Sequence, residues 1–217
     1  MLELWLIRHG QTDWNRQQRW QGQTETPLNQ NGMLQARQLG ARLRAHTFDG
    51  AYSSDMGRCL ETARLSLPGH PLSTDGRLRE LNFGVYEGRA WTELTDAERK
   101  KMGRWWFDPY SEAIEGGESF VDLSARVEAW LDSLPPQGSF AVFTHGGVIR
   151  SLIWRVTGPP RDPAWTLTLE NCSITRLGFG REHINMHCVN DCAHLQPFEF
   201  YEPDLEETPA FDERPAQ

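Results

Sequence analysis

Apolar residues along the chain occur in short runs and periodic patterns rather than in one long hydrophobic stretch. No run exceeds four residues, and one of the longest extends from Leu4 to Ile7. Short apolar runs are typical of buried strands, whereas a membrane-spanning helix needs about 18 consecutive apolar residues or more. The pattern therefore predicts a globular chain without a transmembrane helix and without a membrane partner.

Strand-like runs alternate with segments of helical periodicity through most of the chain. The expected strands are 2–7, 50–53, 139–144, 166–169, 173–178 and 183–189. The expected helices are 31–46, 56–67, 118–134 and 148–156. This alternation predicts an α/β fold with a largely parallel sheet, whose ligand site lies at the carboxyl ends of the strands.

The length and composition agree with one globular domain. The chain has 217 residues, of which 38% are hydrophobic, and these values exclude an intrinsically disordered chain. We assign residues 1–197 to the domain and residues 198–217 to a tail. The N-terminus has no basic segment followed by a long apolar one, so we expect no secretory signal and a cytoplasmic location.

Acidic residues are concentrated at the C-terminus. The formal net charge is -8, and residues 198–217 carry seven acidic residues against one basic residue, so -6 belongs to the tail and -2 to the rest. Nucleic-acid binding requires clustered Lys and Arg, so we expect no nucleic-acid partner. Three prolines in the same segment favour a solvated, poorly ordered tail over an interaction arm.

One Cys/His cluster invites a metal-binding interpretation. Its members are His183, His187, Cys188, Cys192 and His194. This spacing matches none of the common structural zinc patterns. The alternation over 183–189 favours a late strand, so we expect no metal, and a metal-binding module is kept only as an alternative.

Two of the expected strands end in the same chemistry. The first runs into Arg8-His9-Gly10 and the third into His145-Gly146-Gly147. A single histidine at a strand end is more often structural than catalytic. In an open parallel sheet, however, both histidines would face one crevice, and the glycines would let a ligand approach the backbone.

Charged residues between these two strand ends extend the candidate site. Arg58 opens an expected helix just after a strand, where a guanidinium and helix N–H groups together suit an oxyanion. Arg8 beside His9 can contact phosphate oxygens through two nitrogens at once. Glu80 and Glu87, in a turn-rich stretch, are both candidate acids, and their spacing alone does not choose between them.

The motifs together resemble the histidine phosphatase superfamily, in the branch that includes the cofactor-dependent phosphoglycerate mutases. Residues 8–15 are similar to the family's RHG-x-T-x-x-N signature. Further similar segments follow in family order: 21–22, 26–28, 53–58, 62–63, 80–88, 117–119, 144–147, 171–173 and 190–194. The resemblance covers nearly the whole chain to His194. It implies a three-layer α/β/α fold with a mostly parallel sheet and a small helical cap at about 85–117.

The resemblance implies a reaction on a small phosphomonoester. His9 would attack the phosphorus and form a phosphohistidine that water then hydrolyses. Arg8, Arg58 and His145 would surround the transferring phosphoryl group. The two guanidinium groups would also keep His9 neutral by repelling a proton. Because these groups supply the positive charge, the resemblance implies neither a metal nor another cofactor.

The resemblance also separates the two carboxylates. Glu80 corresponds to the family's proton donor to the leaving oxygen, which later serves as the base toward water, and Glu87 is then secondary. Four further residues correspond to positions that line the phosphate and substrate pocket in relatives: Asn15, Gln21, Gly22 and Gly146.

Two departures from the mutase pattern favour a phosphatase. Mutases of this family usually have Asn after the second His-Gly pair and an Arg pair after a Trp in the cap. This chain has Gly147 and, in the cap, Trp105-Trp106-Phe107. Aromatic rings in place of arginines would bind phosphoglycerate poorly. A mutase-type phosphoryl transferase stays an alternative, as does a non-catalytic phospho-ligand binder, although all five expected catalytic residues are present.

The leaving group and the oligomeric state are less constrained. The stretch 80–88 is similar to that of alpha-ribazole phosphatases and of broad-specificity relatives. Five tryptophans either form an apolar wall for a nucleoside-like leaving group or pack in the core and cap: Trp14, Trp20, Trp91, Trp105 and Trp106. A sheet with a free edge strand is compatible with a homodimer, although no residue pattern specifies one.

Overall fold

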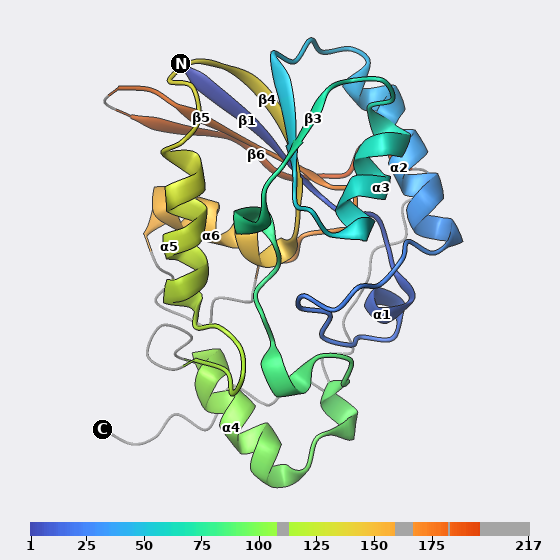
Figure 1. The fold of residues 1–217 in the computed structure, drawn as a ribbon, viewed down its shortest axis with the longest axis vertical. Coiled ribbons are helices and arrows are strands. Elements are labelled where there is room, and N and C mark those ends of the chain that lie inside the picture. The colour runs from blue at the N-terminus through green and yellow to red at the C-terminus, as the bar shows by residue number, and fades with distance from the viewer. Residues whose placement is uncertain (108–112, 159–166, 182, 196–217) are drawn as a thin grey trace.

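A central sheet organises the protein, shown in Figure 1 as a computed structural model that describes residues 1–107, 113–158, 167–181 and 183–195. The strands are β1 (Leu2–Arg8), β2 (Gly50–Ser53), β3 (Leu72–Thr74), β4 (Gly138–Thr144), β5 (Ile174–Phe179) and β6 (Ile184–Asp191). Their order is β3-β2-β4-β1-β5-β6. The first four are parallel, whereas β5 and β6 are each antiparallel to the preceding strand in this order. The expected α/β class with a largely parallel sheet is confirmed.

Helices connect the strands and cover both faces of the sheet. They are α1 (Asp13–Arg16), α2 (Gln30–Leu43), α3 (Gly57–Ser66), α4 (Asp96–Phe107), α5 (Phe120–Leu131) and α6 (Gly146–Thr157). Three 3-10 turns, Gly76–Leu78, Gly84–Tyr86 and Trp91–Glu93, lie between β3 and α4. Side-chain caps define two of the helix starts, since Asn29 accepts from Gly32 N–H and Ser119 forms a capping box with Asp122.

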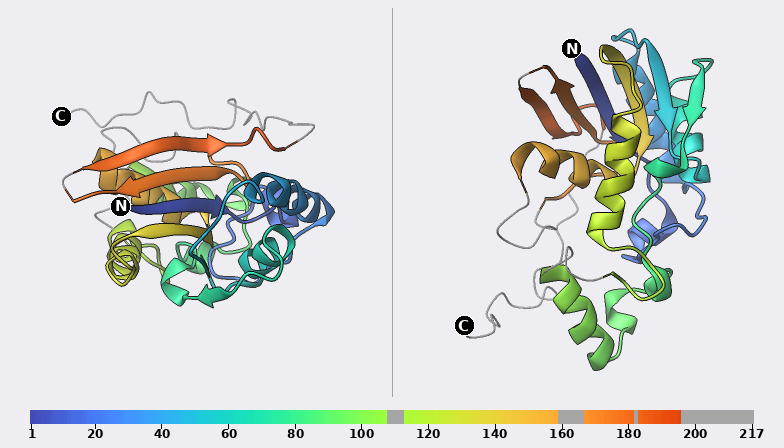
Figure 2. Two further views of the ribbon diagram at one scale, coloured as in Figure 1. Left: turned by 90° about the horizontal axis from the view of Figure 1, so that it is seen from above. Right: turned by 60° about the vertical axis from the view of Figure 1, so that its left-hand side comes forward.

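The alternation of β1 divides the core between the two faces of the sheet. Leu4 and Leu6 are fully buried among side chains of α5 and α6. Trp5 and Ile7 point the other way and pack with side chains of α2 and α3. Figures 1 and 2 show the resulting layers, with α5 and α6 on one side of the sheet and α2 and α3 on the other. The expected three-layer arrangement is confirmed.

Three sequence expectations differ from the structure. The strand expected over 166–169 is wrong for 167–169, which are irregular, and residue 166 lies outside the described residues. The carbonyls of Leu167 and Leu169 accept from arginine side chains instead of joining a strand ladder. The helix expected at 31–46 spans Gln30–Leu43, and it starts at Gln30 because Asn29 caps it. Strand β3 and helix α4 were not expected from the pattern.

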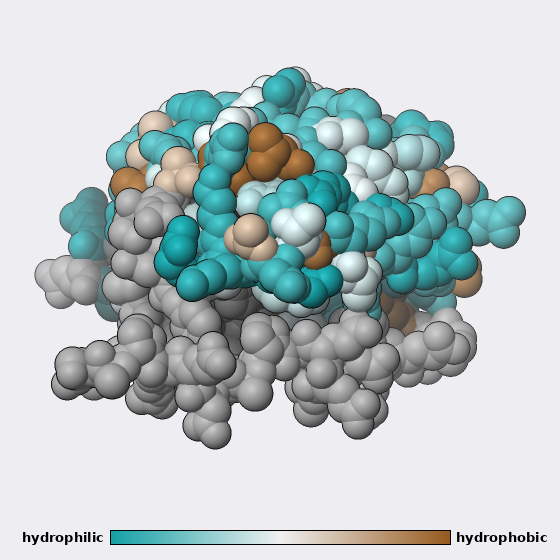
Figure 3. Space-filling model, turned by 90° about the horizontal axis from the view of Figure 1, so that it is seen from below, coloured by the Kyte–Doolittle hydropathy of each residue, from teal (hydrophilic) through white to brown (hydrophobic). Residues whose placement is uncertain are grey.

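Helix α4 lies beyond the carboxyl ends of the parallel strands (Figure 1). It falls within the cap expected at about 85–117, and its buried Met102 and Trp105 continue the core formed by α5 and α6. Viewed from this end, the described surface is largely hydrophilic and is interrupted by small hydrophobic patches (Figure 3). Within the described ranges, no helix is long and apolar enough to cross a membrane. The acidic tail, 198–217, lies outside the described residues.

Candidate active site

His9 lies at the carboxyl end of β1 and is 2% exposed. Its backbone N–H donates to Thr144 O of β4 at 2.9 Å, and its carbonyl accepts from the Asn171 amide at 2.9 Å. The ring Nδ1 lies 2.8 Å from the Gly10 carbonyl oxygen. Because a carbonyl oxygen can only accept, Nδ1 carries the proton and Nε2 keeps its lone pair. The ring is therefore held as the tautomer that a nucleophilic Nε2 requires.

His145 meets His9 from the end of the neighbouring strand β4. The two ring centroids are 5.2 Å apart, and both side chains are buried. Burial lowers the pKa of each histidine well below its ordinary value, and Arg58 and Arg8 lower both pKa values further. Repulsion by the two guanidinium groups is thus the smaller cause of neutrality, and desolvation is the larger one.

Two guanidinium groups face this histidine pair, and each is held by carbonyl oxygens. Arg58 is fully buried and donates to Gly22 O at 2.6 Å and Thr24 O at 2.9 Å. Arg8 donates to Leu169 O. The Nε atoms of both arginines are buried and have no hydrogen-bond partner among the described residues. Buried N–H donors without an acceptor are costly, so the site is suited to an anion that would accept from them.

Glu80 approaches the same site from the loop after the first 3-10 turn. Its Oε1 accepts from its neighbour Leu81 N–H at 2.8 Å and from Gly147 N–H, in the first turn of α6, at 3.0 Å. A Cβ built on Gly147 would lie 2.3 Å from Glu80 Oε1. Glycine at this position therefore leaves the space that the carboxylate occupies. Burial lowers the pKa of Arg8, and the nearby negative charge of Glu80 opposes this shift, which agrees with the place of Glu80 beside the cluster.

Glu87 has a different environment from Glu80. Its carboxylate accepts from Gln23 N–H at 2.8 Å, Thr24 Oγ1 at 2.5 Å and Phe83 N–H at 3.2 Å. It closes the loop that carries Gly22, where φ is +51° and a Cβ would lie 1.9 Å from Glu87 Oε1. The structure thus distinguishes two carboxylates that sequence spacing could not separate, because Glu87 holds the loop that carries Gly22, whereas Glu80 contacts the first turn of α6, directly after His145.

The four expected pocket residues occupy the rim of the site in different ways. Asn15 Oδ1 accepts from Thr12 N–H at 3.0 Å. Gln21 Oε1 accepts from the hydroxyls of Thr12 and Thr26, at 2.9 Å and 2.7 Å. Gly22 contributes its carbonyl to Arg58. Gly146 begins α6 directly after His145. These contacts hold the segment around Gln21 and Gly22 in place and connect it to Arg58.

Sequence reasoning missed a third guanidinium beside the cluster. Arg150, on α6, donates to Leu167 O at 2.8 Å. A Cβ on Gly146 would lie 2.8 Å from Arg150 Nη1 and 3.8 Å from Arg8 Nε. Burial lowers the pKa of Arg150 to about 10, with Arg8 as the second cause. Its position four residues after Gly146, one helical turn away, was the available signal.

Two further residues beside His145 were not predicted as site residues. Ser54 Oγ lies 3.0 Å from His145 Nε2, and Cys59 Sγ lies 3.3 Å from the same nitrogen. Burial raises the pKa of the Cys59 thiol to about 12, so it stays protonated at neutral pH. Both belong to the segment that carries Arg58, and that neighbourhood was the only sequence signal.

Most of the described tryptophans near the cap pack against other rings. Trp20 lies 6.5 Å from Phe83 and 6.3 Å from Trp91, measured between ring centroids. Trp105 is 3% exposed and lies 6.2 Å from Phe83. Core packing, rather than an apolar wall, therefore describes Trp20, Trp91 and Trp105. Trp14 is part-buried, with its ring against Gly88, and the side chain of Trp106 lies outside what the structure describes.

The Cys/His cluster does not converge. His187 is exposed on β6, and His194 Nε2 lies 3.0 Å from the Cys172 carbonyl. Cys188 and Cys192 donate to the carbonyls of Ile174 and Asn190. In the part of the chain that the structure describes, no three His, Cys, Asp or Glu side chains are arranged to hold a metal ion.

Comparison with known proteins identifies the family to which the chain belongs. The family model described as "Histidine phosphatase superfamily (branch 1)" matches residues 4–192. The "Probable phosphoglycerate mutase GpmB" of Salmonella choleraesuis (strain SC-B67) is 39% identical over 184 residues, which cover 82% of this chain and 86% of that protein.

Two solved structures are similar over most of their length. YhfR of Bacillus stearothermophilus has a TM-score of 0.82 at 30% identity, over 89% of this chain and 99% of that one. The alpha-ribazole phosphatase of Shigella flexneri has a TM-score of 0.76 at 29% identity, over 87% and 96%. The matched proteins thus include one named for a mutase and one for a phosphatase.

Proposed function

The chain belongs to the histidine phosphatase superfamily, branch 1, and within it we propose that the protein is a phosphomonoester hydrolase that uses His9 as its nucleophile. The observation that carries this proposal is the buried pair His9 and His145 beside two guanidinium groups whose Nε donors lack a partner among the described residues. A phosphoryl group supplies the acceptor oxygens that such donors need, and its three oxygens carry the charge that they balance.

The first half of the reaction is transfer of the phosphoryl group to His9. The Nε2 lone pair attacks phosphorus in line with the ester oxygen, and the bond between phosphorus and that oxygen breaks. Glu80, in its protonated form, gives its proton to the departing oxygen. Arg8, Arg58 and His145 hold the charge on the phosphoryl oxygens as they pass through the transition state.

The second half is hydrolysis of the phosphohistidine. Glu80, now a carboxylate, takes a proton from a water molecule, whose oxygen attacks phosphorus. The bond between phosphorus and Nε2 breaks, inorganic phosphate leaves, and His9 returns to its neutral form. Positive charge comes from the protein throughout, so the proposed mechanism needs no metal.

Gly147 supports hydrolysis over mutase chemistry. Its N–H donates to Glu80 Oε1, and the absence of a side chain leaves the carboxylate room at the start of α6. An Asn at this position, as in mutases of the family, would meet the carboxylate. The similarity of the alpha-ribazole phosphatase across the fold supports a small phosphorylated metabolite as substrate.

Mutase activity is the second candidate, because the relative at 39% identity carries a phosphoglycerate mutase name. The two candidates predict different products. A hydrolase releases inorganic phosphate from the ester, whereas a mutase interconverts 2-phosphoglycerate and 3-phosphoglycerate with little release. Both need His9, so loss of activity in a His9 variant does not separate them.

The test is phosphate release from a panel of esters in the presence of EDTA. The panel contains alpha-ribazole 5'-phosphate, 3-phosphoglycerate, phosphoserine and p-nitrophenyl phosphate, each with wild type, His9→Ala and the matched variant His187→Ala. We expect release by wild type and His187→Ala and none by His9→Ala. Interconversion of phosphoglycerates without release would establish the mutase, and release that survives in His9→Ala would contradict the nucleophile.

A further inference from the structure

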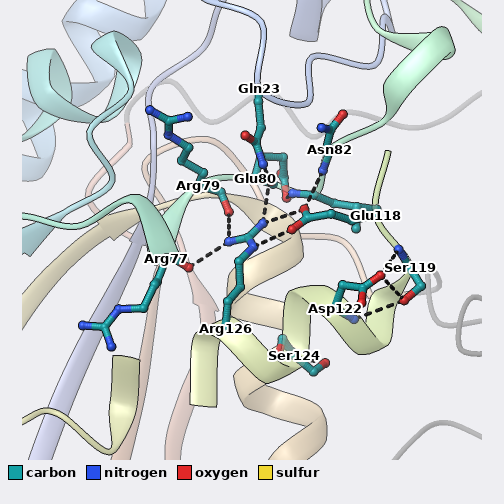
Figure 4. A network of polar contacts seen from close by, with 12 residues as sticks. Gln23, Arg77, Arg79, Glu80, Asn82, Glu118, Ser119, Asp122, Ser124 and Arg126 are labelled. Carbon is teal, nitrogen blue, oxygen red and sulfur yellow. Dashed lines mark hydrogen bonds and ion pairs between the residues drawn. The ribbon is translucent and has the colours of Figure 1, made fainter. Parts of the chain in front are cut away.

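Arg126 on α5 is bound to the loop that carries Glu80. Its Nη1 donates to the carbonyls of Arg77 and Arg79, at 2.8 Å and 2.7 Å, and its Nη2 donates to the carbonyl of Glu80 at 2.8 Å. Figure 4 shows the guanidinium lying between these carbonyls and the carboxylate of Glu118. Arg77 lies in the 3-10 turn Gly76–Leu78, whereas Arg79 and Glu80 follow it in an irregular segment, so Arg126 supplies side-chain donors to backbone carbonyls there.

The ion pair with Glu118 completes the set of contacts. Arg126 Nε donates to Glu118 Oε1 at 2.8 Å and Nη2 donates to Oε2 at 2.9 Å. A guanidinium has five N–H donors, and these five contacts use all of them. The side chains are only 18% and 21% exposed, which distinguishes this pair from the surface ion pairs of the protein. A lysine, with three donors from one nitrogen, could not reproduce the pattern.

Arg126 and Glu118 together form a clamp on the Glu80 loop, and Glu118 contacts this loop on the other side of Glu80. Its Oε2 accepts from Asn82 N–H at 2.9 Å, and its own N–H donates to Asn82 O at 3.0 Å. The backbone is thus fixed at Arg79, Glu80 and Asn82, around the residue whose carboxylate accepts from Gly147 N–H.

We propose that Arg126, paired with Glu118, is a positioning residue for proton transfer by Glu80, an inference that rests on the proposed phosphatase function. Gly147 N–H orients the Glu80 carboxylate from α6, and Arg126 holds the Glu80 backbone from α5. A shift of about 1 Å in a catalytic group costs on the order of 10²-fold in rate. We therefore expect replacement of Arg126 to lower the rate most for esters whose leaving group must be protonated as it departs.

The leaving group gives a readout that a purely structural role would not change. An alkyl phosphate such as glycerol 2-phosphate needs its departing oxygen protonated, whereas p-nitrophenyl phosphate releases a stable phenolate and needs little help. The constant kcat/KM reports the step in which this group departs. We therefore compare kcat/KM for the two esters in wild type, Glu80→Gln, Arg126→Lys and Arg126→Gln.

Arg126→Lys is the principal variant because it keeps the charge, which also lowers the pKa of His145. We expect it to lose about 10 to 10²-fold in kcat/KM on the alkyl ester and less than about 3-fold on the aryl ester. In a Glu80→Gln background we expect Arg126→Gln to cause almost no further loss on the alkyl ester, since the two residues act through one proton transfer.

Arg77→Gln is the matched control, because Arg77 lies on the same loop and also contacts α5, through Ala129 O at 2.8 Å, without touching the Glu80 backbone. We expect it to change neither ester by more than about 2-fold. Equal losses of Arg126→Lys on both esters, or full additivity with Glu80→Gln, would overturn the inference while the hydrolase stands. Wild type inactive on both esters would overturn the proposed function and, with it, this inference.

Discussion

Two regions of the protein collect histidines, and only one of them forms a site. At the ends of β1 and β4, His9 and His145 are buried with ring centroids 5.2 Å apart. Around β6, the residues of the Cys/His cluster contact separate backbone groups, and His187 is exposed. In sequence the second region looks denser, with five candidate ligands within twelve residues. Sequence density was therefore the poorer guide to a site.

The difference follows from strand direction. Parallel neighbours β1 and β4 end at the same edge of the sheet, so residues 136 positions apart, His9 and His145, arrive together. Along the edge strand β6, by contrast, successive side chains alternate between the two faces. Residues that are close in sequence are thereby separated in space. Side chains at the ends of neighbouring parallel strands therefore come together, whereas successive side chains along one strand lie on opposite faces of the sheet.

The largest expected difference between the two regions comes from replacing one arginine in the histidine site and one arginine near β6. Arg58→Lys loses the two-carbonyl contact and the buried Nε donor, so we expect kcat to fall about 10²–10³-fold. Arg176→Lys, on β5 beside Glu3 at 2.6 Å, should change kcat by less than about 2-fold. Steady-state phosphate release measures both, and comparable losses in the two variants would refute the contrast.

The second largest difference is expected from replacing one glycine in each region by alanine. Gly147→Ala would place a Cβ 2.3 Å from Glu80 Oε1, so the carboxylate must move, and we expect about 10 to 10²-fold lower kcat/KM. Gly178→Ala on β5 would meet the end of the His187 side chain at 3.0 Å, which can turn away. The kinetics of both variants on an alkyl ester check this, and an unchanged Gly147→Ala would remove the argument for Gly147.

The buried histidines predict a pH dependence of stability. Their pKa values are lowered in the folded state, so below about pH 6.5 the unfolded chain binds more protons than the folded one. Stability should fall with decreasing pH by about 1.4 kcal/mol per pH unit for each of His9 and His145.

Urea unfolding between about pH 5 and 7, without phosphate, measures this slope. His9→Asn removes one titrating group, so it should make the slope shallower by about one proton. A slope that is the same in His9→Asn and wild type would show that His9 does not resist protonation in the folded state.

The smallest effect is expected from zinc. Because the described side chains of the Cys/His cluster do not converge, one equivalent of Zn²⁺ should raise the melting temperature by less than about 1 °C. Thermal unfolding with and without EDTA measures it. A saturable rise that disappears in Cys192→Ser would instead establish a metal site in that region.

Much of the fold could be predicted from local patterns. The strands at β1, β2 and β4 and the helices α3 and α5 follow from apolar runs, periodicity and caps in their own segments. The conformation of residues 167–169 could not be predicted from their own pattern, because the carbonyls of Leu167 and Leu169 accept hydrogen bonds from arginines in other elements. A short apolar pattern does not record such tertiary partners.

The candidate site was predictable where strand ends and family motifs marked it. His9, His145 and Arg58 come together as expected, and the structure shows the order of causes, with burial ahead of charge repulsion in lowering the pKa of His9. Arg150 and Arg126 were missed because their roles depend on which helix face packs against the site. A single sequence shows that a helix is amphipathic but not what lies opposite each residue.

Trapping of the covalent intermediate shows directly whether His9 is the nucleophile. Enzyme is mixed with an ester labelled in its phosphoryl group, quenched in base within milliseconds, and digested for peptide mapping. We expect an acid-labile, base-stable label on the peptide that contains His9, and we expect this label to be absent from His9→Ala and retained in His187→Ala. Turnover without a labelled peptide, or a label on any other residue, would contradict His9 as the nucleophile.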